Sequence, residues 1–391
     1  MKKLITPLLI VAMVITACSA GNENTTLMTG AERTVEYLPL LRGKRVAVVA
    51  NQTSMVSKTH LVDTLLSEGV DIRLIFAPEH GFRDLADDGT VITSGSDPVT
   101  GIAVISLYSS KKKPVPEDLA DIDVVLFDLQ DVGTRFYTYL TTMCYVMEAC
   151  AENGKQFILF DRPNPNGYYV DGPILDTARY RSFVGIHPIP VVHGMTFGEY
   201  AGMVNGEGWL AGGIRCDLKV ISCTGYTHTT MYRLPVIPSP NLPNMNSIYL
   251  YPSLCLSEGT VLSCGRGTGF AFQVLGAPEI PDSGFSFTPQ PSFGSSNPKY
   301  NGVTCYGIDL RNATEDGLVP KPEINLNWII EMYRAYPDKE NFFNNYFDVL
   351  AGSNTLREQI ISGMSAAEIR ASWKEGLERF SATREKYLLY D

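Results

Sequence analysis

Residues 73–83 read Arg-Leu-Ile-Phe-Ala-Pro-Glu-His-Gly-Phe-Arg, an apolar run that ends at Pro78 and continues into a short polar turn. This pattern predicts a buried strand followed by a loop. In an open α/β sheet, the loops at the carboxyl ends of the strands line the ligand crevice. Glu79, His80 and Arg83 are therefore the first candidates for chemistry. The alternative is that Glu79 and Arg83 only form an ion pair on a solvated loop.

Further apolar runs have the composition of parallel strands that are buried on both faces. They comprise residues 44–52, 102–107, 123–131, 156–161 and 217–222. Helices are expected over residues 60–69, 137–152 and 197–207. A capping box of Thr196 and Glu199 precedes the last of these. This alternation predicts right-handed crossovers and an α/β fold with a Rossmann-like, mostly parallel sheet. No G-x-G-x-x-G motif follows the first strand, so a dinucleotide is not expected.

The second part of the chain has a different character. Residues 235–246 are too rich in proline for regular structure and are expected to cross between subdomains. Beyond them, strands are expected over residues 270–275 and 302–309, and helices over residues 325–336 and 366–387. The predicted organisation is a Rossmann-like N-terminal subdomain over residues 33–230 and a smaller α+β C-terminal subdomain over residues 231–391.

The N-terminal segment MKKLITPLLIVAMVITAC has two lysines, a short apolar core and small residues before Cys18. These features predict a secretory signal peptide over residues 1–17 rather than a mature membrane span. The end of the segment is similar to a bacterial lipobox, which predicts lipidation of Cys18 and a tether over residues 18–32. A membrane partner and a cell envelope location, periplasmic or outer-membrane associated, follow. Ordinary signal cleavage nearby is the alternative.

The net charge and the spacing of the cysteines exclude several classes of function. The formal net charge is −10, and it becomes −12 without residues 1–17, which hold two lysines and no acidic residue. Such an acidic chain is not expected to bind nucleic acid. The cysteines after Cys18 include no C-x-x-C pair, so we expect mostly buried thiols. Neither a metal nor another cofactor is expected, because no H-E-x-x-H or similar ligand spacing occurs.

Polar side chains gather at the predicted strand ends and in two later glycine-rich loops. The candidates are Asn51, Asp128, Asp131, Arg135, Asp161, Arg162 and Asn164 at strand ends, with His193, Glu258 and Arg266 in or beside the later loops. Carboxylates, amides and arginines together suit a hydroxyl-rich or anionic ligand. Alternatively, the two acids near residue 130 cap helices and the nearby arginines neutralise them. The alternative for the GRGTG loop around Arg266 is a glycine-rich turn between strands without a role in binding.

Several strings spread over the chain carry a family resemblance. They are VANQTS (49–54), PEHGFR (78–83), SLY (106–108), FDLQDVGTRFYTY (127–139), DRPNPNG (161–167), VHGMT (192–196), PSPNLPN (238–244) and SEGTVLSCGRGT (257–268). Together they resemble the exo-lytic β-N-acetylmuramidases (NamZ-type, glycoside hydrolase family 171). The resemblance implies two subdomains around a cleft that removes a non-reducing-end N-acetylmuramic acid residue from peptidoglycan fragments.

The resemblance also suggests roles for the candidate residues. Glycoside hydrolysis needs an acid for the departing oxygen and a group that stabilises the oxocarbenium-like centre. We assign Glu79 as the general acid. Asp128 and Glu258 are catalytic candidates for the second group, with Asp131, Asp161 and the substrate's own N-acetyl group left open.

The remaining candidates are expected to bind the saccharide. Arginine binds carboxylates in a bidentate manner, so three arginines are candidates for the lactyl carboxylate of the sugar. They are Arg135, Arg162 and Arg266. The alternative function is a non-catalytic surface lipoprotein that binds sugars or muropeptides, and a metal-dependent hydrolase is a second rival.

Overall fold

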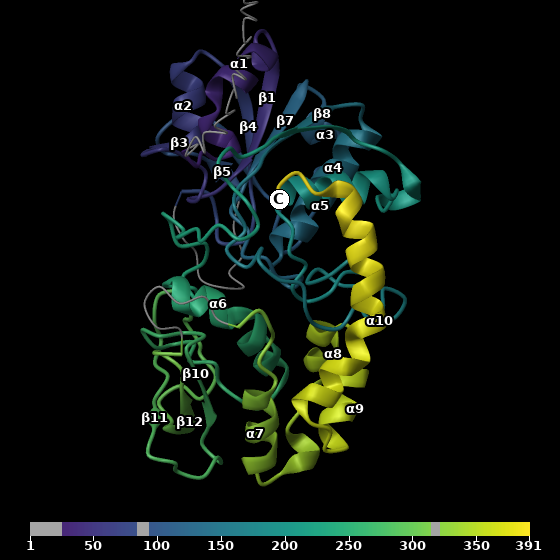
Figure 1. Cartoon of the computed structure of the whole chain (residues 1–391). Coiled ribbons are helices and arrows are strands. Elements are labelled where there is room, and N and C mark those ends of the chain that lie inside the picture. Colours follow the sequence, from purple (N-terminus) through teal and green to yellow (C-terminus); the bar gives the residue numbers. More distant parts are fainter. Residues whose placement is uncertain (1–25, 84–93, 314–320) are drawn as a thin grey trace, which may run out of the picture.

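The computed structural model describes residues 26–83, 94–313 and 321–391. Figure 1 shows an upper lobe built on the N-terminal part of the chain and a lower lobe built on the later part. The last long helix, α10 (Ala366–Arg384), runs beside both lobes and brings the C-terminus back to the upper one.

A seven-stranded sheet forms the upper lobe, with strand order β5-β6-β4-β1-β7-β8-β9. All neighbouring pairs are parallel except β5 with β6. The strands are β1 (Arg45–Ala50), β4 (Asp71–Ala77), β5 (Gly95–Ser96), β6 (Ala103–Ser106), β7 (Val124–Asp128), β8 (Gln156–Phe160) and β9 (Asp217–Ile221), and a small hairpin pairs β2 (Met55–Val56) with β3 (Thr59–His60). The predicted α/β fold class is confirmed.

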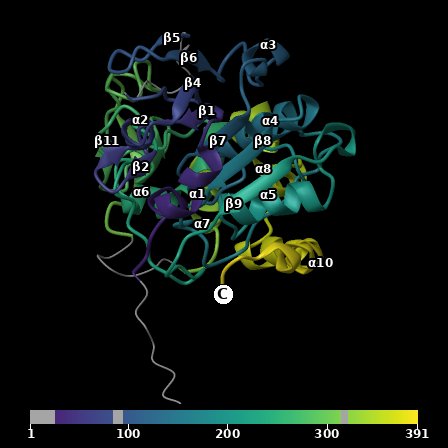
Figure 2. The same cartoon turned by 90° about the horizontal axis from the view of Figure 1, so that it is seen from above.

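Alternate residues of each central strand face opposite layers, as a pleated strand requires. Val46, Val48 and Ala50 of β1 share one core cluster with residues of α1 and α2. Ala47 and Val49 belong to a second cluster with residues of α4 and α5. Figure 2 shows α2 on one side of the central strands and α4 and α5 on the other. Burial on both faces explains why these runs lack polar residues until they end.

The helices of the upper lobe are α1 (Thr34–Leu41), α2 (Leu61–Ser67), α3 (Pro116–Leu119), α4 (Tyr139–Glu152) and α5 (Phe197–Gly206), with 3-10 helices η1 (Gly30–Glu32) and η2 (Ala211–Gly213). The capping box predicted for α5 is present, because the Thr196 side chain accepts from the Glu199 amide. Helix α1 was not expected from the sequence, since Pro39 lies inside it.

The lower lobe contains a three-stranded antiparallel sheet of order β10-β12-β11 and a group of helices. Its elements are β10 (Val274–Ala277), β11 (Ser286–Phe287), β12 (Cys305–Asp309), α6 (Met245–Leu254), α7 (Asn327–Ala335), α8 (Asn345–Ala351), α9 (Thr355–Ile361), η3 (Cys255–Gly259) and η4 (Lys339–Asn341), and η5 (Glu385–Tyr387) follows α10. The expected strand over residues 270–275 starts later, because Phe272 has a left-handed backbone with φ of 55°.

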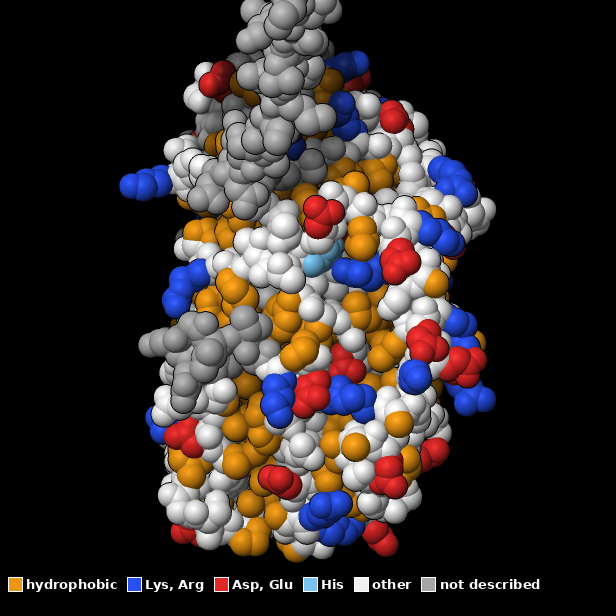
Figure 3. Space-filling model, viewed as in Figure 1, with side chains coloured by type: hydrophobic (Ala, Val, Ile, Leu, Met, Phe, Trp, Pro, Cys, Tyr) orange, Lys and Arg blue, Asp and Glu red, His pale blue; other side chains and the backbone are white. Residues whose placement is uncertain are grey.

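The charged surface and the buried thiols are those of a globular domain. On the face that carries α10 (Figure 3), acidic and basic side chains are interspersed. All seven cysteines after Cys18 are buried and free, as expected. Within the described residues, none of the helices combines the length and apolar character of a membrane span.

A buried arginine joins the two lobes. The Arg135 guanidinium donates to the carbonyls of Pro173 and Ile189 in the upper lobe and of Leu350 in α8, each at 2.8 Å. Arg135 is only 2% exposed. Burial lowers its pKa to about 9, so the side chain is still charged at neutral pH. These contacts require both lobes to be in place.

We expect Arg135→Met to lower the free energy of unfolding by about 3 to 5 kcal/mol, because three buried carbonyls lose a charged donor. Urea unfolding followed by circular dichroism measures this change. The matched control is Arg379→Met, which removes an exposed ion pair with Glu375 on α10 and should leave the unfolding midpoint unchanged. Equal midpoints for both variants would contradict a linking role for Arg135.

Candidate active site

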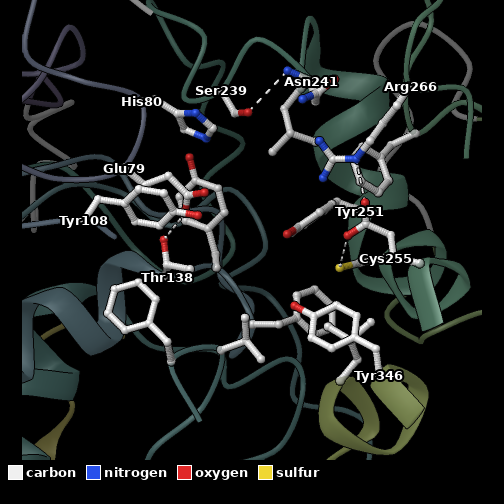
Figure 4. A pocket seen from close by; sticks show the side chains of 18 of the residues that line it. Glu79, His80, Tyr108, Thr138, Ser239, Asn241, Tyr251, Cys255, Arg266 and Tyr346 are labelled. Atoms are coloured by element: carbon white, nitrogen blue, oxygen red, sulfur yellow. Dashed lines mark hydrogen bonds and ion pairs between the residues drawn. The ribbon is translucent and has the colours of Figure 1, made fainter. Parts of the chain in front are cut away.

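A pocket of about 410 Å³ lies between the carboxyl edge of the main sheet and the lower lobe. This volume is in the usual range for small-ligand sites. Figure 4 shows Glu79, His80 and Tyr108 on one wall and Arg266, Cys255 and Tyr346 on the other. A larger groove of about 1150 Å³ beside α10 contains none of the residues predicted to carry chemistry. We therefore take the pocket between the lobes as the candidate site.

The turn after β4 places Glu79 on the first wall. Pro78 ends the strand, the Gly81 amide donates to its carbonyl at 3.2 Å, and His80 has a left-handed backbone with φ of 71°. Backbone strain of this kind is concentrated at functional sites. The turn therefore brings the carboxylate and the imidazole to the pocket as neighbours.

Two side chains from the start of α4 hold this turn. The Thr138 hydroxyl donates to Glu79 Oε2 at 2.7 Å, and the Tyr139 hydroxyl donates to the Glu79 carbonyl at 3.0 Å. Asn51 Nδ2 in turn donates to the Tyr139 hydroxyl at 3.0 Å. Glu79 is 8% exposed. Its carboxylate is thus fixed at both its side chain and its backbone.

The second wall carries a carboxylate from the lower lobe. Glu258 lies in η3, and its Oε1 accepts from Arg266 Nε at 2.5 Å. The Cys255 thiol lies 3.8 Å from Glu258 Oε2. Arg266 stands between two glycines with left-handed backbone, and a Cβ on Gly267 would overlap Pro298. The GRG sequence therefore permits the tight loop that holds the guanidinium beside Glu258.

Aromatic side chains complete the pocket. Tyr108, Phe136, Tyr251 and Tyr346 line it together with the Phe183 ring. Tyr137 also lines the pocket, and burial raises its pKa well above the usual value, with Tyr139, Asp131 and Glu79 adding to the effect. The Tyr137 hydroxyl therefore remains a donor, and it binds the Pro238 carbonyl of the segment between the lobes at 2.9 Å.

The pocket brings together only part of the predicted set. Glu79, His80, Glu258 and Arg266 line it. The other candidates do not line it, which corrects the expectation that all strand-end polar groups share one ligand cleft. They are Asn51, Arg83, Asp128, Asp131, Arg135, Asp161, Arg162, Asn164 and His193. Each of these side chains binds other groups of the protein.

Asp128 and Arg162 form a buried bidentate ion pair. Arg162 Nε and Nη2 lie 2.6 Å and 2.8 Å from the two carboxylate oxygens of Asp128. Asp128 is 0% exposed and Arg162 is 4% exposed. The pair satisfies both charges inside the lobe. The catalytic role expected for Asp128 and the lactyl contact expected for Arg162 remain predictions. The geometry of the pair favours neither of them.

Arg83 forms its ion pairs with two aspartates and not with Glu79. Its guanidinium contacts Asp63 at 2.6 Å and Asp97 at 2.8 Å. The alternative of an ion pair between Glu79 and Arg83 is therefore wrong. Both acids lie in the upper lobe, so Arg83 holds the chain after the Glu79 turn against that lobe.

The remaining candidates organise loops beneath the pocket. Asp131 Oδ2 accepts from the Gly133 amide at 2.9 Å and lies 3.5 Å from His193 Nε2. Asn164 binds the backbone of Asn166 and the carbonyl of Met195 at 2.8 Å each. These contacts join the loops that follow β7 and β8. They give the side chains a structural position instead of a ligand contact.

Asp161 occupies the N-terminal end of α5. Its carboxylate accepts from the Thr196 hydroxyl at 2.7 Å, the Gly198 amide at 2.8 Å and the Tyr390 hydroxyl at 2.7 Å. Tyr390 belongs to the C-terminal segment that returns to the upper lobe. The carboxylate therefore anchors this segment, which sequence reasoning did not foresee.

Sequence reasoning missed several lining residues. Tyr108, Thr138 and Asn241 line the pocket and lie within the strings that carry the family resemblance. Their place in these strings is the feature of the sequence that could have identified them. Lys112 and Tyr346 lie outside those strings and have no local signal. Among the residues that the structure describes, no three His, Cys, Asp or Glu side chains cluster with the geometry of a metal site.

The fold and the pocket define a two-lobed α/β protein with carboxylates on both walls of a saccharide-sized site. The family model described as "Exo-beta-N-acetylmuramidase NamZ, N-terminal" matches residues 46–246, and "Exo-beta-N-acetylmuramidase NamZ, C-terminal" matches residues 249–390. The chain belongs to the exo-β-N-acetylmuramidase NamZ family. The resemblance inferred from the sequence strings is thereby confirmed.

Similar proteins cover almost the whole chain. It is 40% identical over 375 residues to the peptidoglycan β-N-acetylmuramidase NamZ of Bacillus subtilis (strain 168), across 91% of this chain and 89% of that protein. A solved DUF1343 family protein from Bacteroides fragilis NCTC 9343 is 47% identical, with a TM-score of 0.87 over 93% of this chain and 99% of its own. A second one from the same strain is 29% identical, with a TM-score of 0.77 and the same coverage.

The buried Asp161 carboxyl predicts a pH dependence of stability. Burial raises its pKa from 3.8 to about 6, against the opposing effect of its hydrogen bonds. The folded state then binds more protons than the unfolded state between these values. This contribution to stability is therefore fully present below pH 3.8 and is lost as the pH rises through about 6.

Asp161→Asn removes this titration. Relative to the variant, the wild-type free energy of unfolding should fall by about 3 kcal/mol between pH 4 and pH 7. Urea unfolding of both proteins at a series of pH values measures the difference. A difference that stays constant across this range would show that Asp161 titrates normally.

Proposed function

We propose that the pocket binds the non-reducing-end N-acetylmuramic acid of peptidoglycan fragments. The protein is a glycoside hydrolase, an exo-acting β-N-acetylmuramidase that removes this residue from the saccharide. The observation that carries the proposal is the meeting of Glu79 and Glu258, from different lobes, at one pocket of sugar size. Family membership and the B. subtilis relative support the same reaction and substrate.

Glu79 is the general acid in this proposal. The Thr138 hydroxyl holds one oxygen of its carboxyl group. The carboxyl group then protonates the glycosidic oxygen as the bond breaks. The fixed Glu79 backbone, bound by Tyr139, keeps the proton donor in place without reorganisation during the reaction.

Glu258 is the second carboxylate. Of the four acids considered for this role, it alone lines the pocket. Its charge stabilises the positive charge that develops at the anomeric carbon, and the Arg266 contact at 2.5 Å orients it. His80 lies beside Glu79 and donates or accepts at a sugar hydroxyl. A pocket closed by two lobes suits the terminal unit of a chain, in agreement with exo action.

The binding-protein alternative is less well supported. A protein that only captures a sugar does not need two carboxylates at the glycosidic bond, and the curated relative is a hydrolase. Calorimetry with N-acetylmuramic acid and a reducing-sugar assay on the same sample distinguish the two functions. Binding without release of sugar from a muramic acid disaccharide would favour the alternative.

Glu79→Gln should lower kcat by about 10²- to 10⁴-fold on a disaccharide with non-reducing N-acetylmuramic acid. It should lower kcat much less on 4-nitrophenyl β-N-acetylmuramide, because nitrophenolate leaves without a proton. Steady-state kinetics on both substrates measure this contrast. The same loss on both substrates would contradict the acid role.

Two further variants sharpen this test. Glu258→Gln should lower kcat on both substrates, since charge stabilisation is needed whatever group departs. Glu375→Gln replaces an exposed glutamate on α10 and should match the wild type. Circular dichroism of all three variants verifies that the fold is retained.

The N-terminal segment supports a second part of the proposal. Cleavage of the signal peptide before Cys18 and lipidation of that residue would tether the enzyme to a membrane of the cell envelope, in a periplasmic or outer-membrane associated position. Residues 1–25 lie outside the described residues, so the sequence pattern alone supports this anchor. An envelope location matches the peptidoglycan substrate.

Cys18→Ala should abolish incorporation of a radiolabelled fatty acid and move the protein from the membrane fraction to the soluble fraction. Lipidation requires this thiol, whereas the neighbouring Ser19→Ala should retain the label. Labelling and fractionation of bacteria that express the full chain measure both properties. Membrane association of Cys18→Ala at the wild-type level would contradict the anchor.

A further inference from the structure

Three consecutive lysines follow β6, and they have different surroundings. Lys111 Nζ lies 2.6 Å from Asp118, and Lys113 Nζ lies 3.1 Å from Glu148 and 2.7 Å from Glu152. Lys112 lines the pocket, and among the described residues no carboxylate forms an ion pair with it. The two outer lysines therefore anchor the loop to the upper lobe, whereas the middle one faces the site.

An aromatic ring holds the Lys112 ammonium at a defined position. Its Nζ lies 4.6 Å from the centroid of the Phe183 ring, a cation–π contact. Phe183 stands on a tight turn in which Ser182 and Gly185 exchange backbone hydrogen bonds of 2.9 Å and 3.1 Å. Gly185 packs against the buried Arg135 side chain. The charge is thus positioned by a rigid part of the fold.

The other charged groups of the pocket leave this lysine available to a substrate anion. Glu79, as the general acid, carries its proton when the substrate binds, and the Glu258 charge is balanced by the Arg266 guanidinium that lies against it. Arg135 and Arg162, the other arginines expected to bind an anionic substrate group, do not line the pocket. Among the described residues that line the pocket, Lys112 is then the cation that a substrate carboxylate can bind without competing with Glu258.

We propose that Lys112 binds the lactyl carboxylate of N-acetylmuramic acid and sets the preference for muramides over sugars that lack this group. The proposal rests on the proposed function. The Lys112 ammonium compensates the substrate charge, and the Phe183 ring limits the positions that it can take. Lys112 is a specificity residue and takes no part in bond cleavage.

The test compares 4-nitrophenyl β-N-acetylmuramide with the methyl ester of its lactyl group, which has the same shape without the charge. Lys112→Met should lower kcat/KM for the acid by about 10- to 100-fold, mainly through KM, and leave the ester within twofold. Lys111→Met is the matched control, because Lys111 does not line the pocket. It should keep the wild-type ratio of acid to ester.

Two outcomes would overturn the proposal. One is a wild-type kcat/KM for the acid in Lys112→Met, and the other is an equal loss on acid and ester, which would assign Lys112 only to pocket shape. If the wild type hydrolyses neither substrate, the proposed function fails separately. Calorimetry then tests Lys112, since the wild type should bind N-acetylmuramic acid more tightly than its methyl ester, and Lys112→Met should bind both equally.

Discussion

The buried guanidinium of Arg135 is the interaction on which the geometry of the site depends. A charge without a carboxylate partner is costly to bury, and it is tolerated here because carbonyls from both lobes converge on it. The same side chain packs against Gly185 in the turn that carries Phe183, and Gly352 after α8 leaves room for it. One group thus sets the spacing between two walls of the pocket, and any relative shift of the lobes would leave its donors unpaired.

Around this contact, the polar residues at the strand ends fall into two groups, called here the lower and the upper tier: those that contact only other parts of the protein, and those that line the pocket. The lower tier is buried and makes its contacts within the protein, with the Asp128 and Arg162 pair as its centre. The upper tier is the Glu79 turn, which the lower tier supports through Asn51 and Tyr139. Few of these side chains are therefore placed to contact the ligand, and the others hold those few in position. This division is typical of sites in which catalysis depends on preorganised charge.

The sequence predicted the sheet well, because continuous apolar runs between helical segments have few other solutions. It predicted the Glu79 turn for the same reason, since Pro78 must end the strand. It did not separate ligand-facing from inward-facing polar groups, because an aspartate at a strand end has the same local pattern in either case. Asp128 and Asp161 show this directly. Tyr346 and Lys112 reach the pocket through tertiary packing alone, so no local pattern identified them.

The C-terminal segment adds a second constraint that no local pattern indicates. Leu389 and Tyr390 bind Glu199 and Asp161 of the upper lobe, at 2.9 Å and 2.7 Å. Helix α10 therefore spans both lobes (Figure 1) and limits hinge motion between them. A pocket walled by two lobes that are joined at Arg135 and again along α10 keeps its shape before the ligand arrives, which lowers the entropic cost of binding.

The central claim is that the pocket between the lobes holds the terminal sugar with its glycosidic bond beside Glu79. A crystal structure of the protein with bound N-acetylmuramic acid tests it most directly. The account predicts the anomeric carbon between the carboxyl groups of Glu79 and Glu258. A sugar bound in the groove beside α10, or in the pocket with its anomeric carbon remote from Glu79, would contradict it.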